Sequence, residues 1–196
     1  MYSYVSRLSS SRVLLALAFI AVVGVTSPNA AILIYNVTMD GPSESPPVVS
    51  PGTGSGTVTF DTVLHTMRVQ GSWSGLVGNT TVSHIHGPTA VAFAGTAGVA
   101  TTTPTFTGFP AGVTAGSYDH TFDMTLATSY NAAFITANGG TPASAEVALL
   151  AYVAAGRTYW NIHSSFVGSG EIRGFLVPAP VPAESKTWGS IKALYR

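Results

Sequence analysis

The chain has 196 residues, no cysteine, 46% hydrophobic and only 8% charged residues, and a formal net charge of zero at pH 7. This length allows one domain with short appendages. The lack of cysteine excludes a disulfide scaffold, a thiol nucleophile and a thiolate-bound metal. Residues 32–177 carry three arginines against seven acids, hence a net charge of −4. This charge argues against a nucleic-acid partner, because a nucleic-acid binder needs a basic face.

Residues 1–31 have the features of a secretory signal peptide. Arg7 and Arg12 come before an unbroken apolar run at positions 13–25. Such a run suits the hydrophobic region of a signal peptide and is short for a membrane span. We expect cleavage after Ala30 or Ala31, and therefore a mature protein without a transmembrane span that is secreted, at the cell surface or in the periplasm. An uncleaved anchor is the alternative, and it also implies export.

Seven or so short strands and one helix are expected between this leader and the C-terminal segments. Alternation and turn residues predict strands at residues 32–39, 57–61, 64–73, 80–86, 118–126, 157–164 and 171–177. The helix is expected between Thr141, a good N-cap, and Gly156, a natural residue just after a helix end. This pattern predicts a mostly β fold, namely an antiparallel β-sandwich with Greek-key connections, similar to immunoglobulin or superoxide dismutase, with one short inserted helix.

The C-terminal end consists of a proline-rich spacer at residues 178–183 and a basic tail at residues 184–196. Proline-rich spacers are stiff. The tail places Trp188, Ile191 and Leu194 near helical spacing, with basic residues between them. One interpretation is a frayed, weakly amphipathic end. The other is a sorting or attachment signal, because the position resembles that of bacterial C-terminal sorting signals, although an LPxTG-like motif and a hydrophobic span are missing.

Four motifs stand out in the body of the chain. They are SESPP around Glu44, HIHGPT at residues 84–89, YWNIHS at residues 159–164 and GEIRGFL at residues 170–176. In order and spacing they resemble the hallmarks of the CHRD domain, a family first described in chordin and found in many secreted bacterial proteins. The resemblance covers residues 32–177 and implies an extracellular, mostly β domain in a single-domain bacterial protein. It does not imply a reaction, because the family has no established catalytic mechanism to transfer.

Three histidines are candidate metal ligands. His84 and His86 lie two positions apart in one predicted strand, so their side chains share a face about 6.5–7 Å apart. His163, at the end of another predicted strand, is the candidate third ligand. Neutral imidazoles suit zinc or copper, which are therefore the candidate cofactors. The alternative is structural, with the histidines donating hydrogen bonds to loop carbonyls, and a catalytic role is the third possibility.

Four other polar residues are expected to form a structural network: Glu44, Asn161, Glu171 and Arg173. Glu171 and Arg173 share one face of the last predicted strand. Arginine can clamp a carboxylate through two parallel hydrogen bonds, so Arg173 is expected to hold Glu44 or Glu171. A site for a ligand carboxylate, built on Arg173, is the alternative.

Two functions follow from these observations. The first is a secreted, non-enzymatic protein that acts in adhesion, envelope or matrix interactions with an unknown extracellular protein or matrix partner. The second is a small extracellular metal-binding or redox protein that uses His84, His86 and His163.

Overall fold

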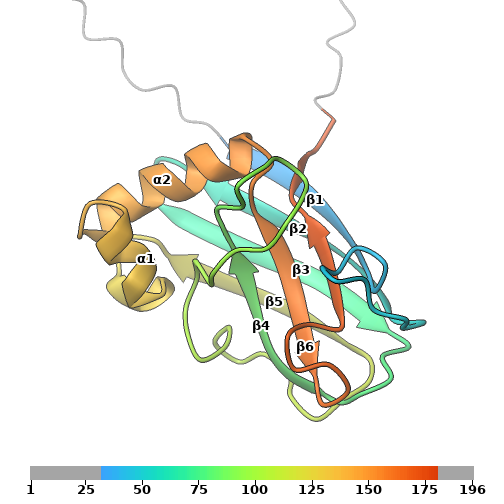
Figure 1. Ribbon diagram of the computed structural model, residues 1–196. Helices are drawn as coiled ribbons and strands as arrows, with labels where there is room; N and C mark the ends of the chain where they lie inside the picture. Colours follow the sequence, from blue (N-terminus) through green and yellow to red (C-terminus); the bar gives the residue numbers. More distant parts are fainter. Residues whose placement is uncertain (1–31, 181–196) are drawn as a thin grey trace, which may run out of the picture.

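The computed structural model describes residues 32–180, so the predicted signal peptide and basic tail lie outside the described residues. In chain order the elements are β1 (Ile32–Asp40), β2 (Thr53–Asp61), β3 (Thr66–Ser74), β4 (Thr80–His86), β5 (Gly116–Asp123), a 3-10 turn (Ala127–Ser129), α1 (Ala132–Ala137), α2 (Pro142–Ala154), β6 (Tyr159–Ser164), β7 (Ile172–Phe175) and β8 (Val177–Pro178). The predicted mostly β, antiparallel fold is confirmed (Figure 1).

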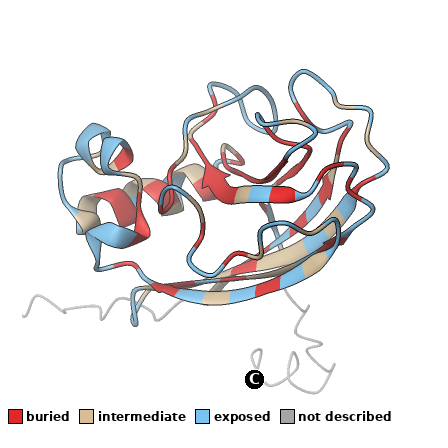
Figure 2. Cartoon of the chain, turned by 90° about the horizontal axis from the view of Figure 1, so that it is seen from below, coloured by how far each residue is buried: buried red, intermediate tan, exposed pale blue. Residues whose placement is uncertain are grey.

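All eight strands of the described part belong to one antiparallel sheet in the order β4-β6-β7-β1-β2-β3-β5, with β8 paired to β1. Strand β1 is central, with β4, β6 and β7 on one side and β2, β3 and β5 on the other. The sheet curls so that these two groups of strands form facing layers, and α1 and α2 lie at one end of them (Figures 1 and 2). The hydrophobic core fills the space between the layers.

Trp160 of β6 shows how the two layers meet. Its side chain is fully buried, and it lies against Gly56 of β2 and Gly71 of β3, which face each other in register. A Cβ atom at either glycine would collide with the indole ring. The indole Nε1 donates a hydrogen bond of 2.7 Å to Ser83 Oγ, as a buried indole N–H requires. The glycine pair thus makes room for the largest side chain of the core.

Helix α2 begins where the sequence predicts. Thr141 is its N-cap and accepts a hydrogen bond from the Ser144 amide, and proline occupies the first helical position. The structure adds the shorter helix α1, which the sequence analysis did not predict because six residues are too few for a clear apolar periodicity. Asn131 caps this helix by accepting from the Ala133 amide. Between residues 32 and 180, neither helix is long and apolar enough to cross a membrane.

Strand β6 is buried at all six positions, on both faces of the sheet. Trp160 and Ile162 point into the core between the layers. Because successive side chains in a strand point to opposite faces, Tyr159, Asn161 and His163 point to the outer face. There they are covered by the long connection from β4 to β5 and by the loop from β6 to β7, whose carbonyls they contact.

Candidate metal centre

A buried layer of polar side chains lies on the outer face of β4, β6 and β7, beneath these loops. In the register of β4 and β6, His84 lies opposite Asn161 and His86 lies opposite Tyr159. Arg173 of β7 lies opposite Asn161. We call this set the polar layer: His84, His86, Tyr159, Asn161, His163, Glu171 and Arg173, with Glu44 from the loop after β1.

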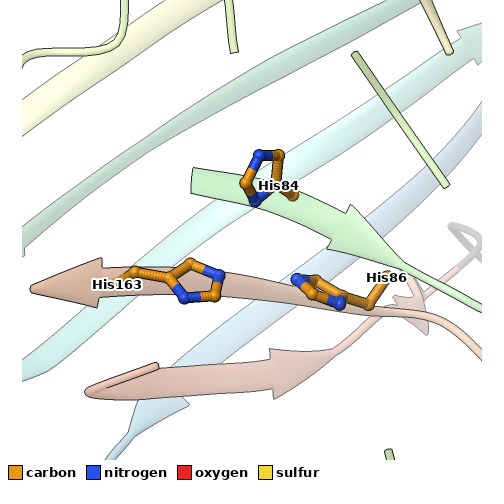
Figure 3. A group of neighbouring side chains, drawn as sticks. All are labelled: His84, His86 and His163. Atoms are coloured by element: carbon orange, nitrogen blue, oxygen red, sulfur yellow. The ribbon is translucent and has the colours of Figure 1, made fainter. Parts of the chain in front are cut away.

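The structure brings the three candidate histidine ligands together at one end of the polar layer. The ring centroids lie 5.8 Å apart for His84 and His86, 5.5 Å for His84 and His163, and 5.6 Å for His86 and His163. The three rings thus form a nearly equilateral triangle. One nitrogen from each ring lies within 4.8 Å of the corresponding nitrogen of the other two. Figure 3 shows the three rings pointing toward one another from β4 and β6. No more than 8% of any of the three residues is exposed.

One nitrogen of each ring contacts a backbone carbonyl, and this contact determines the tautomer. The contacts are His84 Nε2 to Pro104 O (2.7 Å), His86 Nδ1 to Ala97 O (2.9 Å) and His163 Nδ1 to Gly168 O (2.9 Å). A carbonyl oxygen only accepts hydrogen bonds, so the proton of each neutral ring must be on the nitrogen that faces the carbonyl. Backbone carbonyls serve the same purpose behind metal-bound histidines, where they orient the ring.

The other nitrogen of each ring faces the centre of the triangle. These atoms are Nδ1 of His84, Nε2 of His86 and Nε2 of His163, and each is buried without a hydrogen-bond partner in the protein. Burial lowers the pKa of all three imidazoles, in His86 to about 4. The rings are therefore neutral at pH 7, and three unprotonated nitrogens with free lone pairs converge on one point.

A metal ion fits this arrangement. Zinc–nitrogen bonds are about 2.0–2.1 Å long, whereas three nitrogens at most 4.8 Å apart lie less than about 3 Å from their common centre. Each ring therefore needs to move inward by less than about 1 Å. The donor set also fits, because neutral imidazole is a common ligand for both zinc and copper.

Glu171 has a different environment in the polar layer. It is fully buried, and its carboxylate accepts hydrogen bonds from Ser50 Oγ (2.6 Å), the Val77 amide (2.6 Å), the Gly78 amide (3.1 Å) and Ser164 Oγ. Burial alone would raise the pKa of Glu171, but these hydrogen bonds together lower it. The carboxylate is thus charged at pH 7 and joins three segments of the chain.

Arg173 lies near Glu44 without the bidentate geometry that the sequence analysis considered. Its Nε is 3.8 Å from Glu44 Oε2. The guanidinium donates hydrogen bonds to two backbone carbonyls instead, those of Ser43 and Gly95. Burial raises the pKa of Glu44 to about 7, and the charge of Arg173 counteracts this only partly. Glu44 Oε1 and Asn161 Oδ1 are buried without hydrogen-bond partners in the protein.

Tyr159 connects Arg173 with the histidine cluster. The Arg173 Cζ atom lies 4.6 Å from the centroid of the Tyr159 ring. The His86 ring stacks on the same tyrosine, with centroids 4.9 Å apart and an interplanar angle of 8°. The sequence analysis places this residue in the motif YWNIHS, on the same face as His163, but assigns it no role. The hydrogen bonds from the histidines to loop carbonyls agree with the structural alternative of the sequence analysis. It could not name Ala97, Pro104 and Gly168, since backbone acceptors leave no signal in the sequence.

Comparison with known proteins identifies the family. No curated protein and no solved structure matches the chain. The CHRD domain family matches residues 35–176, which include all four motifs and the whole polar layer. CHRD domains occur in extracellular proteins, and membership supports a non-enzymatic domain. The expected resemblance is confirmed: this chain belongs to the CHRD domain family.

Proposed function

We propose that this CHRD domain is a non-enzymatic binding protein for one copper or zinc ion, held by His84, His86 and His163. One observation carries the proposal: three buried imidazole nitrogens without partners lie within 4.8 Å of one another. A buried acceptor without a hydrogen bond costs roughly 1–3 kcal/mol, and lone pairs that face each other repel. A metal ion removes both costs at once.

A water molecule between the three nitrogens would satisfy fewer of them than a metal ion does. Water has two hydrogens and donates to two acceptors, so one of the three nitrogens would stay without a partner. A purely structural role for the histidines explains only the three nitrogens that face carbonyls. The convergence of the other three nitrogens is explained by an ion that accepts three lone pairs.

Elemental analysis of the purified domain, residues 32–180, tests the proposal. We expect one copper or zinc ion per chain after loading and desalting. The ion should be lost in the double variant His84→Ala/His86→Ala. The matched control is His65→Ala, which removes an exposed histidine outside the cluster and should leave the metal content unchanged. A metal-free protein after loading, with the same stability before and after chelation, would overturn the proposal.

The other members of the polar layer are proposed to be structural. Arg173 and Glu171 connect three loops to β6 and β7 through backbone and hydroxyl groups. We assign to Glu44, Asn161, Glu171 and Arg173 the task of holding these loops over the histidine cluster. Changing any of them should loosen the loops, which amide hydrogen exchange measures, without removing a metal ligand.

Adhesion or matrix binding is the second candidate function. An exposed apolar groove supports it, lined by β1 and the segment after β7: Ile32, Leu33, Ile34, Tyr35, Pro178, Ala179 and Pro180. Exposed apolar patches often mark interaction sites. The variant Ile34→Ser should release the protein from the cell surface into the medium, with Leu64→Ser, exposed elsewhere, as control. If both variants and the wild type divide equally between cell surface and medium, the groove has no role in attachment.

Two further predictions belong to this second candidate function: export by the signal peptide, and attachment through the C-terminal tail. N-terminal sequencing of the exported protein should give a first residue of Ala31 or Ile32, according to the two predicted cleavage positions. Deletion of residues 184–196 should move the protein from the cell surface to the medium if the tail is an attachment signal. An unchanged distribution would leave the tail without this role.

A further inference from the structure

The charge around the histidine cluster distinguishes between the candidate ions. Within residues 32–180, His84, His86 and His163 are the one group of three or more metal-binding side chains that meet at a common point. This ligand set contains no carboxylate, and its rings are neutral at pH 7. The bound ion therefore keeps its full positive charge inside the protein.

A fixed positive charge lies one aromatic ring away from the cluster. Arg173 is 3% exposed, and its guanidinium and the His86 ring both pack on Tyr159. The field of this arginine thus reaches the nitrogen ligands and disfavours additional positive charge there.

Neither acid of the polar layer forms a hydrogen-bonded ion pair with this charge. Glu44 is 3.8 Å from Arg173, but burial raises its pKa to about 7, so it is only partly ionised at neutral pH. Glu171 is ionised, but its carboxylate oxygens bind hydroxyl and amide donors and form no ion pair with Arg173. The site is therefore better suited to an ion of low charge than to a divalent ion.

The electrostatic cost of burying an ion rises with the square of its charge. For ions of equal size, a divalent ion costs about four times as much as a monovalent ion when both leave water for a medium of low dielectric constant. Zinc also prefers four ligands in a tetrahedral arrangement, whereas three nitrogens complete the coordination of monovalent copper. Charge and ligand number favour the same ion.

We infer that the histidine cluster selects Cu(I) over Zn(II) and Cu(II). This inference rests on the proposed function, and it adds the oxidation state and the physical cause of selectivity. The cluster is neutral, buried and close to the cation of Arg173, so it discriminates by charge. Discrimination by ligand softness would require sulfur ligands, and none is present in the cluster.

Competition titrations test the inference on the purified protein under anaerobic conditions. Cu(I) is added as its acetonitrile complex, so that no reductant is needed, and competes with a coloured Cu(I) chelator. Zn(II) and Cu(II) are titrated separately against chelators of known affinity. We expect Cu(I) to bind at least about 100-fold more tightly than Zn(II) or Cu(II). The X-ray absorption edge of the bound copper should be that of Cu(I) with three nitrogen ligands.

The charge mechanism is tested by Arg173→Gln, which should reduce the preference for Cu(I) over Zn(II) about tenfold. The control is Arg68→Gln, because Arg68 forms an exposed pair with Asp119. If Arg173→Gln does not fold, Glu44→Gln serves instead. It removes a compensating negative charge and should increase the preference. An unchanged preference in the folded variant would overturn the charge mechanism.

The outcomes separate the two proposals. If none of the three ions binds, the proposed function fails. If an ion binds but Zn(II) or Cu(II) binds as tightly as Cu(I), the proposed function stands and the selectivity for Cu(I) is overturned. Tight Cu(I) binding that depends on the three histidines, with the expected response to Arg173→Gln, supports both.

Discussion

Strands β3 and β6 lie in facing layers, but they place their polar side chains in different surroundings. In β3, Met67, Val69 and Trp73 are buried and alternate with partly or fully exposed residues such as Arg68, and the strands of this layer alternate in colour in Figure 2. In β6 all six residues are buried. Water satisfies the outer face of β3, whereas the outer face of β6 depends on partners inside the protein. Because the histidine nitrogens lack such partners, the candidate site lies on β6 and its neighbour β4.

The largest expected effect concerns the inner, apolar face of β6. The variant Trp160→Ala should reduce the free energy of unfolding by about 3–5 kcal/mol, because it leaves a cavity above the glycine pair at positions 56 and 71. Urea denaturation of the metal-free protein measures this loss. Trp160→Phe should lose less, since it keeps part of the ring. A loss below about 1 kcal/mol for Trp160→Ala would show that the layers do not depend on this contact.

Metal binding on the outer face of β6 should stabilise the folded protein by less than the Trp160 side chain does. At a free ion concentration about 100 times the dissociation constant, the free energy of unfolding should rise by about 2.7 kcal/mol. Thermal denaturation with and without the ion measures this gain. It should vanish in His163→Gln and persist in His65→Gln, whose ring contacts Glu146 outside the cluster. A gain of equal size in both variants would place the bound ion elsewhere.

A variant of Glu171 tests whether the polar layer stabilises the fold through residues that do not bind the metal. Glu171→Gln should lower the free energy of unfolding by about 1.5–3 kcal/mol at pH 7, because the side-chain amide nitrogen then faces the backbone amide of either Val77 or Gly78. The matched control Asp119→Asn, in an exposed pair with Arg68, should lose no more than about 1 kcal/mol.

The pH dependence has a definite sign. Since the folded-state pKa of Glu171 is lowered, its stabilisation is present above the unfolded value of about 4.3 and is lost as the pH falls through the folded value. Unfolding curves at pH 7 and at successively lower pH should therefore converge for the wild type and Glu171→Gln. Parallel loss at every pH would contradict a role for the charged carboxylate.

The difference between the two strands also shows how far the sequence predicts the molecule. Alternation and turn residues predict β4 with the bounds observed, and Thr141 with Pro142 predicts the start of α2. Spacing places His84 and His86 on one face. Their proximity to His163 depends on the pairing of β4 with β6, which spacing alone does not reveal. The carbonyls that orient the rings and the amides that hold Glu171 are backbone groups in loops, so no residue type indicates them.

The smallest expected effect comes from Glu44 and has the opposite pH dependence to that of Glu171. Because the folded-state pKa of Glu44 is raised to about 7, the folded state binds the proton more tightly than the unfolded chain. Its contribution to stability is present below the unfolded pKa of about 4.3 and is lost as the pH rises to about 7. Partial solvent screening limits the loss to the order of 1 kcal/mol.

The variant Glu44→Gln removes this titration. It should make the free energy of unfolding flatter between about pH 4 and pH 7, the window set by the unfolded and folded pKa values. Urea denaturation of metal-free protein across this range measures the slope, with Asp61→Asn in the exposed β2–β3 turn as control. An unchanged slope in Glu44→Gln would mean that Arg173 keeps Glu44 ionised. The positive charge beside the histidines would then be balanced by the nearby Glu44 carboxylate.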